Sequence, residues 1–391
     1  MKVMIACGGT GGHLFPGVAV AEVLRARRHQ VRLLVSEKAI DQTALAVSTG
    51  CFNRSDGIAV EAVPAVGYEG AGRLIPFCLR LARATRECVA ACDEFEPDVV
   101  LGMGGFTTAP AIFGARWFRR RGTAKLIHES NAVPGKANRW AGRFADHVAV
   151  GLADCARYFG RKPVTVTGTP IRATLRRGKV ADARGRLGLE TGRLTVLVAG
   201  GSQGAHAINE GVALALPWLK TRVDALQFVH LTGVKDERFM RETYERNGVR
   251  ARVMSFCGQM ELAYSGADMV VARSGASTLT EIAAFGLPSI LIPYPQATGN
   301  HQWHNARVFE RAGAARLIEQ PRRLDGCREG SSTDREHMER GKQLAKVIGD
   351  LIDDETGRAT MSRAARSLVV DDAAERIATL LERYGRQTAT D

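Results

Sequence analysis

The stretch VMIACGGTGGHLFPGVA at residues 3–19 is the clearest indication of the fold class of this chain. A short apolar run, typical of a buried strand, ends in a turn of glycines and continues as a helical pattern. The stretch VLVAGGSQGAHAINEGVA at 196–213 repeats this order, and the glycine pair 8–9 recurs 192 positions later at 200–201. Two copies of strand, glycine turn and helix indicate two similar α/β halves, each opening with a turn that suits a phosphate.

Other apolar runs alternate with Ala- and Leu-rich helical segments along the rest of the chain. They lie at 31–35, 98–105, 125–129, 147–151, 226–233, 268–275 and 289–295. Strands that alternate with helices predict parallel sheets covered on both faces, which is a doubly wound α/β fold. A length of 391 residues suits two domains of about 150–200 residues each.

We expect the two domains to divide near residue 165. An N-terminal Rossmann-like domain should cover 1–165 and a C-terminal one 166–371. A final helix over about 372–391 should pack back on the first domain. The charged stretch 321–342 is typical of a surface insertion or a mobile loop.

Net charge and hydropathy limit the class of protein. The net charge is +13, and residues 1–165 hold 22 Lys and Arg against 14 Asp and Glu, so 22 − 14 = +8 lies in that part. A basic surface attracts nucleic acid, anionic lipid or phosphorylated ligands, and charge alone does not choose among them. No run of 18 apolar residues is present, and no apolar signal segment follows Met1, so we expect neither a membrane-spanning helix nor a secretory signal.

The eight cysteines are scattered and form no CxxC pair. Cys88 and Cys92 lie four apart on a predicted helix, where they read as two small apolar side chains on one face. This pattern predicts reduced thiols, no zinc site and a cytosolic protein.

Four glycine-rich segments follow predicted strands, at 8–13, 102–106, 200–205 and 273–278. A strand that turns through glycines into a helix leaves backbone N–H groups and the positive end of the helix dipole facing the ligand crevice. A dinucleotide fingerprint starting at Gly9 fails because its sixth position is Leu14, although Glu37 ends the second strand where a ribose-binding acid would lie. The GxxxxGK[ST] loop of ATPases is absent.

Polar residues gather after the predicted strands of the first half. His13 ends the first glycine loop and could take a proton from an acceptor hydroxyl, or could simply bond to backbone at the start of its helix. The stretch HESNAVPGKANRW at 128–140 brings together His128, Glu129, Ser130, Asn131 and Asn138. Polar residues gathered directly after a buried strand indicate a ligand-binding site. Capping of the next helix is the alternative role for Ser130 and Asn131.

In the second half, Glu281 lies inside the helix that follows the glycine loop 273–278. Its carboxylate could accept both hydroxyls of a ribose, or could be favoured there by the helix dipole alone. Gln302 and Asn305 are three residues apart on one helix face. They could hold sugar hydroxyls or form a solvated face.

Together these motifs resemble the MurG family over residues 1 to about 320. The series is GGTGGHLFPGVAVAEVL (8–24), GMGGFTTAP (102–110), HESNAVPGKANRW (128–140), GTPIR (168–172), GGSQGAHAIN (200–209), SGASTLTEIAAFGLPSILIPYP (274–295) and HQWHNA (301–306). The resemblance implies the GT-B fold, in which two Rossmann-like doubly wound domains face a central cleft. It also implies inverting transfer of N-acetylglucosamine from UDP-N-acetylglucosamine to the muramyl C4 hydroxyl of lipid I, which gives lipid II for peptidoglycan synthesis.

The resemblance carries site residues over position by position. The uracil of the donor would lie near Cys257, with Arg172 also close to the nucleotide. Glu281 would bind the ribose hydroxyls. Gln302 would face the hydroxyls of the transferred sugar, with Asn305 in support. The diphosphate would lie on Ser202 and on the loop of Ala276, Ser277, Thr278, Leu279 and Thr280. From the N-terminal half, Thr10, Gly11, Gly12 and Asn131 would close on the donor.

His13 corresponds to the base proposed for the family, and Glu129 and His128 would help to form the acceptor site. Helix dipoles and backbone amides can stabilise a departing UDP, so we expect no metal and no cofactor. Phe106 stands where many members have Tyr, and Asn300 replaces an acid.

The resemblance also implies a peripheral protein on the cytoplasmic face of the bacterial cell membrane. Segments 73–86 and 116–121 mix apolar side chains with arginines and could dock on anionic inner-leaflet lipids, or could be ordinary surface helices. A different GT-B glycosyltransferase or a UDP-sugar epimerase is the second hypothesis. We expect no nucleic-acid partner, because zinc patterns, recognition-helix cues and basic strands with interleaved aromatics are lacking.

Overall fold

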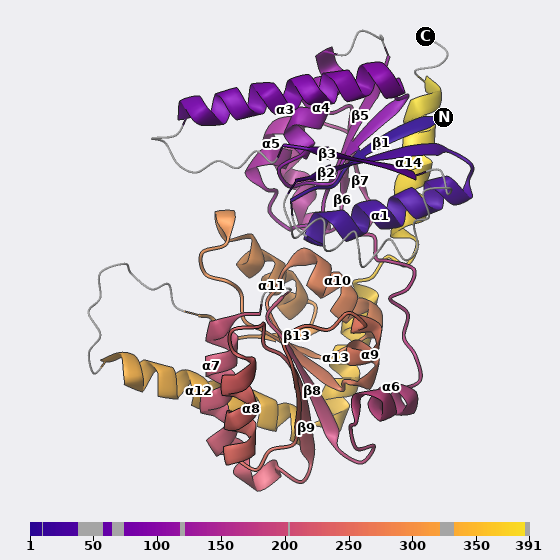
Figure 1. Ribbon diagram of the computed structural model, residues 1–391. Helices are drawn as coiled ribbons and strands as arrows, with labels where there is room; N and C mark the ends of the chain where they lie inside the picture. The colour runs from indigo at the N-terminus through magenta and orange to yellow at the C-terminus, as the bar shows by residue number, and fades with distance from the viewer. Residues whose placement is uncertain are drawn as a thin grey trace. The chain divides into compact units, whose positions relative to one another are not determined.

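The computed structural model describes residues 1–9, 11–37, 58–64, 74–117, 122–201, 204–320 and 332–387. The chain forms two compact units (Figure 1). Unit 1 comprises Met1–Ala173 and Val370–Asp391, and unit 2 comprises Thr174–Val369. Within the described ranges, no helix combines the length and apolar character needed to cross a membrane.

Unit 1 is built on a parallel sheet whose strand order is β3-β2-β1-β4-β5-β6-β7. Its strands are β1 (Lys2–Ala6), β2 (Gln30–Ser36), β3 (Ile58–Val63), β4 (Val99–Gly102), β5 (Ala124–Glu129), β6 (His147–Val150) and β7 (Val164–Val166). Its helices are α1 (Gly11–Ala26), α3 (Leu74–Phe95), α4 (Thr108–Trp117), α5 (Lys136–Ala141), the 3-10 helix η3 (Ala153–Phe159) and α14 (Ala373–Gln387).

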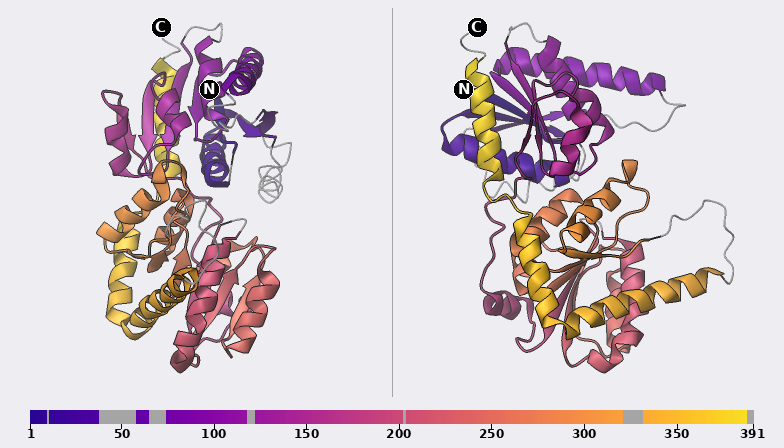
Figure 2. Two further views of the ribbon diagram at one scale, coloured as in Figure 1. Left: turned by 90° about the vertical axis from the view of Figure 1, so that its left-hand side faces the viewer. Right: turned by 180° about the vertical axis from the view of Figure 1, so that it is seen from behind.

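Helices cover both faces of this sheet (Figure 2). Successive residues of a strand point to opposite faces, so Val3 and Ile5 pack with α1 and α14, whereas Met4 and Ala6 pack with α3, α4 and α5. The predicted pair Cys88 and Cys92 is buried on the inner face of α3, as expected for two small apolar side chains. The continuous apolar runs of the sequence therefore reflect strands that are buried on both sides.

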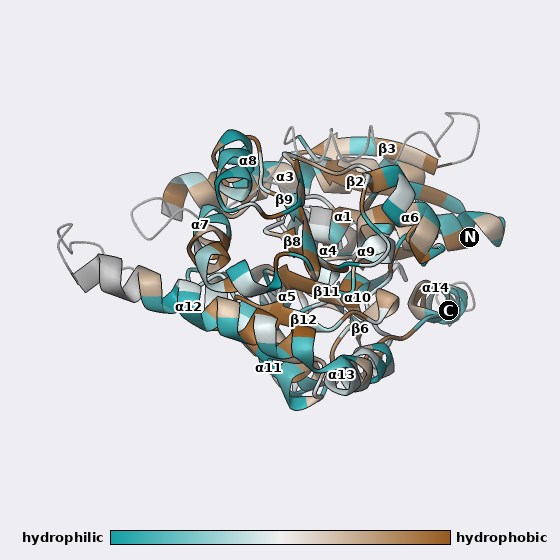
Figure 3. Ribbon diagram, turned by 90° about the horizontal axis from the view of Figure 1, so that it is seen from below, coloured by the Kyte–Doolittle hydropathy of each residue, from teal (hydrophilic) through white to brown (hydrophobic). Residues whose placement is uncertain are grey.

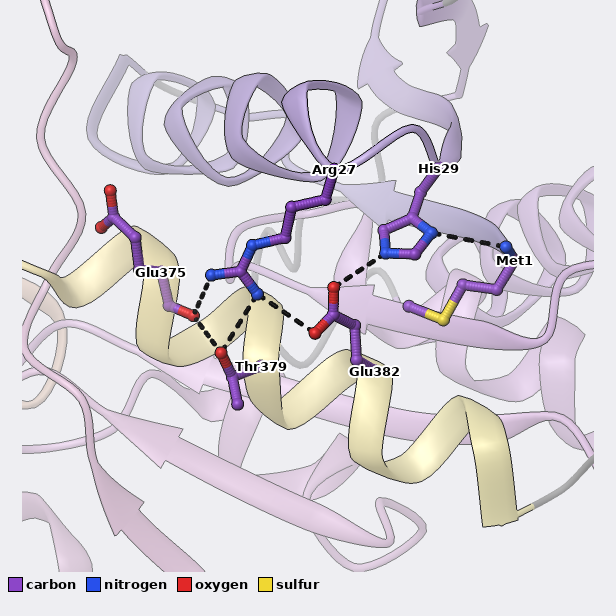
Figure 4. A network of polar contacts seen from close by, with 6 residues as sticks. All are labelled: Met1, Arg27, His29, Glu375, Thr379 and Glu382. Atoms are coloured by element: carbon purple, nitrogen blue, oxygen red, sulfur yellow. Dashed lines mark hydrogen bonds and ion pairs between the residues drawn. The ribbon is translucent and has the colours of Figure 1, made fainter.

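The C-terminal helix α14 completes unit 1. Ile377 and Leu381 are fully buried against α1 and the sheet. Arg27 donates to Thr379 Oγ1 and Glu382 Oε2 at 3.1 Å each, and His29 Nε2 lies 2.8 Å from Glu382 Oε1 (Figure 4). Segments from the two ends of the chain thus share one core and one polar network.

Unit 2 repeats the design with the order β10-β9-β8-β11-β12-β13, again parallel. Its strands are β8 (Leu194–Ala199), β9 (Leu226–Leu231), β10 (Ala251–Met254), β11 (Met269–Ala272), β12 (Ser289–Leu291) and β13 (Ala315–Leu317). Its helices are α6 (Val180–Leu187), α7 (His206–Ala215), η4 (Leu216–Arg222), α8 (Glu237–Arg246), α9 (Met260–Gly266), α10 (Ala276–Phe285), η5 (Thr298–Asn300), α11 (His301–Arg311), α12 (Ser332–Asp353) and α13 (Glu355–Ser367).

In unit 2, strands β11 and β12 are hydrophobic and helix α8 is mostly hydrophilic (Figure 3). Val196 and Val198 of β8 pack towards α7, α8 and α12, and Leu197 packs on the other face with α9 and α10. Both sheets therefore have the order of a Rossmann-type mononucleotide-binding fold. This confirms the predicted pair of similar doubly wound halves and the GT-B class of fold.

Candidate active site

The glycine loops of unit 1 follow β1 and β4, the two strands between which the strand order reverses. Open α/β sheets bind ligands at this point, beyond the carboxyl ends of the strands. The two loops are tied together, since the Gly8 N–H donates to Thr107 Oγ1 at 2.9 Å. A Cβ on Gly104, which has a φ of +102°, would lie 2.7 Å from His13 Nδ1. Glycine at 104 is therefore required both by the backbone conformation and by the closeness of the imidazole.

His13 lies in the first turn of α1 and points its ring at the loop after β4. Its Nδ1 is 3.2 Å from the carbonyl oxygen of Met103. A carbonyl can only accept, so Nδ1 carries the proton in neutral His13 and Nε2 carries the lone pair. The backbone contact, which is the alternative to a catalytic role, is thus present, and it leaves Nε2 as the ring nitrogen that can accept a proton.

Glu129 ends β5 and is almost fully buried. Its Oε1 accepts from the Asn131 N–H at 2.9 Å and from Asn131 Nδ2 at 2.8 Å. Its Oε2 accepts from the Gly135 N–H at 3.0 Å and from Asn138 Nδ2 at 3.1 Å. The carboxylate is therefore the centre around which the loop 131–138 folds, and Asn131 and Asn138 meet on it.

His128 is fully buried beside Glu129. Its Nε2 donates to the Gly168 carbonyl at 2.9 Å, and its Nδ1 lies 3.5 Å from Ser130 Oγ. Burial lowers the pKa of this imidazole and outweighs the opposing effects of the Gly168 carbonyl and Glu129. His128 is therefore neutral, and its ring joins the ends of β5 and β7.

Arg172 belongs to unit 1 by its contacts. Its guanidinium lies over the ring of Phe15 at 4.1 Å, on the same helix as His13. Burial raises the pKa of Glu22, and the charges of Arg25 and Arg172 oppose that rise. The cation is thus held near the first turns of α1 by stacking and by charge.

The glycine loops of unit 2 follow β8 and β11, again on either side of the reversal in strand order. A Cβ on Gly204, which has a φ of +76°, would lie 2.1 Å from the Thr232 carbonyl oxygen, so the loop after β8 can approach β9 only with glycine there. The loop after β11 leads into α10, whose first turn holds Ala276, Ser277 and Thr278. This turn offers backbone N–H groups and the positive end of the helix dipole.

The next residues of α10 have structural partners. Leu279 is buried and its N–H donates to the Gly275 carbonyl at 3.0 Å. The Thr280 hydroxyl donates to the Ala276 carbonyl at 2.9 Å. Glu281 is half-buried, and its Oε2 accepts from the Tyr264 hydroxyl at 2.8 Å.

Gln302 and Asn305 lie on α11, at the predicted spacing. Gln302 Oε1 accepts from the Tyr294 N–H at 2.9 Å, so the side-chain amide turns its NH₂ group away from that contact. Asn305 is fully buried and donates to the Ser274 carbonyl at 3.1 Å. Asn305 therefore fastens α11 to the loop after β11.

Arg273 is a residue of this site that the sequence analysis did not single out. It follows β11, is 8% exposed, and donates through Nη1 to the carbonyls of Ile292 and Pro293 and to Gln320 Oε1. Burial lowers its pKa to about 10. The sequence did mark Arg273, because it follows the apolar run MVVA (269–272) directly. Burying a charge there costs free energy unless the charge has hydrogen-bond partners.

Cys257 lies in the loop between β10 and α9 and is half-buried, and burial raises the pKa of its thiol. Its neighbour Phe256 is 57% exposed. Thr10 and Ser202 lie outside the described residues, as do 118–121 and 321–331 of the predicted surface segments.

The chain matches two family models, the glycosyltransferase family 28 N-terminal domain over residues 3–150 and the glycosyltransferase family 28 C-terminal domain over 195–377. A UDP-N-acetylglucosamine–N-acetylmuramyl-(pentapeptide) pyrophosphoryl-undecaprenol N-acetylglucosamine transferase of Syntrophus aciditrophicus is 39% identical over 81% of this chain and 85% of its own. The protein of the same name from Geotalea uraniireducens is 36% identical over 96% of both chains. The crystal structure of Acinetobacter baumannii MurG superposes with a TM-score of 0.72 at 26% identity, covering 98% of this chain and 99% of that one.

Proposed function

This chain belongs to the MurG family within glycosyltransferase family 28, and from that membership we propose its reaction and the roles of its residues. It transfers N-acetylglucosamine from UDP-N-acetylglucosamine to the muramyl sugar of lipid I, the undecaprenyl-pyrophosphoryl acceptor, and so makes lipid II for peptidoglycan. The observation that carries this function is 36% identity to a transferase of that name over 96% of both chains.

Unit 2 binds the donor. The ribose hydroxyls bind Glu281, the uracil binds beside Cys257, and Arg172 is a further residue proposed to bind the nucleotide. The diphosphate binds Ser202 and the first turns of α10, from Ala276 to Thr280, where the helix dipole favours an anion. Gln302 presents its NH₂ group to a sugar hydroxyl, which accords with the contact that holds its oxygen on the Tyr294 N–H.

Unit 1 binds the acceptor and starts the reaction. His13 Nε2 takes the proton of the muramyl C4 hydroxyl as that oxygen attacks C1 of N-acetylglucosamine from the face opposite UDP. The new C1–O bond forms as the bond from C1 to the phosphate oxygen breaks, and the electron pair leaves with UDP, so the configuration inverts. Glu129 shapes the loop of Asn131 and Asn138, and Thr10, Gly11 and Gly12 are further residues proposed to bind the donor.

Glu281→Ala should weaken binding of UDP-N-acetylglucosamine by about 10- to 100-fold, because hydrogen bonds to a charged acceptor contribute about 1.5–3 kcal/mol. Calorimetric titration measures binding, and transfer to a lipid I analogue measures activity, with UDP-glucose and UDP-galactose as competing donors. Glu245→Ala, at an exposed acid on α8, is the matched control and should change neither. Donor binding without transfer to the lipid I analogue would refute the assignment of lipid I as the acceptor. Equal use of the three donors would refute the assignment of N-acetylglucosamine as the transferred sugar.

The membrane association of this enzyme is peripheral, on the cytoplasmic face, through unit 1. Ile75 and Leu79 on α3 and Trp117 at the end of α4 are 75%, 67% and 66% exposed. Arg80, Arg83 and Arg86 are exposed on the same α3 helix. Apolar side chains beside arginines suit the boundary of an anionic bilayer.

Replacing both Ile75 and Leu79 by Ser should weaken binding to phosphatidylglycerol vesicles by tenfold or more, since burying such a side chain contributes about 1.5–3 kcal/mol. Co-sedimentation measures the effect. Val234→Ser, at an 84% exposed apolar residue of unit 2, is the control and should bind as the unchanged protein does. Unchanged binding of the double variant would show that α3 is not the docking surface.

A further inference from the structure

A buried tyrosine hydroxyl reaches the ribose-binding carboxylate of unit 2. Tyr264 lies on α9, is 2% exposed, and donates its hydroxyl hydrogen to Glu281 Oε2 at 2.8 Å. The two residues are 17 positions apart and lie on different helices. The contact therefore depends on the packing of α9 against α10.

The ring of Tyr264 is fixed by the core. It packs on Phe285, one turn beyond Glu281 on α10, with ring centroids 5.1 Å apart and planes at 36°. The same apolar cluster holds Leu197 of β8 and Val270 of β11 around it. A ring held on this many sides keeps its hydroxyl in one place, so the contact with Glu281 needs little further ordering.

One donated hydrogen bond orients a carboxylate without using up its acceptor capacity. An ionised carboxylate has about four lone-pair sites on its two oxygens, and a ribose diol offers two hydroxyl hydrogens. The Tyr264 hydroxyl occupies one site on Oε2 and fixes the plane of the group. A carboxylate held in one orientation before any nucleotide arrives has less conformational freedom to lose on binding, which lowers the cost of binding.

We infer that Tyr264 is a positioning residue that makes donor binding depend on the ribose hydroxyls. It aligns Glu281 for the 2′ and 3′ hydroxyls and so favours ribonucleotides over deoxynucleotides. The inference rests on the proposed function, because it takes Glu281 to be the ribose ligand. It also links two parts of nucleoside recognition, since α9 begins three residues after Cys257, where the uracil is proposed to lie.

Tyr264→Phe tests this with the ring and its contact with Phe285 retained. In the full-length protein, the Kd for UDP should rise about fivefold to tenfold, because the carboxylate that Tyr264 no longer holds must be ordered when the nucleotide binds. The Kd for 2′,3′-dideoxy-UDP should change by less than about twofold, because that nucleotide cannot use the oriented carboxylate. Calorimetric titration of both nucleotides gives the discrimination ratio, which should fall by the same fivefold to tenfold.

Two further variants separate positioning from a purely structural role. Tyr244→Phe removes another buried hydroxyl of unit 2, which bonds to His230 Nδ1 at 3.0 Å, and should leave the discrimination ratio unchanged. Tyr264→Phe combined with Glu281→Ala should bind UDP no more weakly than Glu281→Ala alone, since the hydroxyl acts only through Glu281.

The outcomes distinguish the inference from the function beneath it. An equal loss of affinity for both nucleotides in Tyr264→Phe, with Glu281→Ala still impaired for UDP, would overturn the positioning role and leave the donor site standing. If Glu281→Ala bound UDP as the unchanged protein does, the proposed ribose site would fall, and the inference would fall with it.

Discussion

His13→Ala should lower the turnover number for sugar transfer by about 10²- to 10⁴-fold, the usual contribution of a positioned acid or base. The reason is geometric, because the Met103 carbonyl holds the proton on Nδ1 and leaves the lone pair on Nε2. The donor ligands proposed above lie mainly on unit 2, so the Kd for UDP-N-acetylglucosamine should stay within about twofold. Steady-state transfer and calorimetric titration measure the two quantities separately.

His13→Asn is the sharper variant. Its side-chain amide can still donate to the Met103 carbonyl, but it has no basic nitrogen. It should therefore be as inactive as His13→Ala while it disturbs the loops of unit 1 less. If either variant kept near-normal turnover, His13 would not be the base.

Ending the chain after Val369 should prevent unit 1 from folding. The change removes α14, whose Ile377 and Leu381 are buried in the core of that unit. Burial of two such side chains contributes about 3–6 kcal/mol, against a typical stability of 5–15 kcal/mol for a domain. The same cut removes Glu382, the partner of Arg27 and His29, and Tyr384, whose hydroxyl lies 2.9 Å from His147 Nδ1.

Thermal unfolding followed by circular dichroism should show only the transition of unit 2 in this truncated protein. A chain that ends after Gln387 is the control, because it keeps α14, and it should unfold as the full chain does. Leu381→Ala should give an intermediate result, with a loss of about 2–5 kcal/mol in unit 1. Two native transitions in the chain ending at Val369 would contradict the role of α14.

The sequence predicted the buried strands well because each is a continuous apolar run. The runs at 226–233 and 268–275 contain observed strands, and those at 3–7 and 125–129 coincide with observed strands that begin one residue earlier. The strands it missed lie away from the centre of each sheet. β7 and β13 have three residues each, which is too short for a recognisable apolar run. The runs of β3 and β10 are interrupted by the charged residues Glu61 and Arg252.

The site was predictable where one motif holds both a residue and its partner. Glu129, Asn131 and Asn138 fall within one quoted stretch, and they meet in the structure. Contacts between distant segments leave no such pattern. Tyr264 touching Glu281, and Arg273 reaching Gln320 from 47 positions away, follow from the packing of helices and strands that a single sequence does not specify.

The return of α14 to unit 1 sets an order of events during synthesis. The ribosome completes residues 174–369, the whole of unit 2, before it makes α14. At about 5–20 residues per second, the apolar surface of α1 and the sheet that α14 covers stays open for about 10–40 s. Unit 2 can therefore fold first although it is made second, while the nascent N-terminal half exposes apolar surface to which a chaperone can bind.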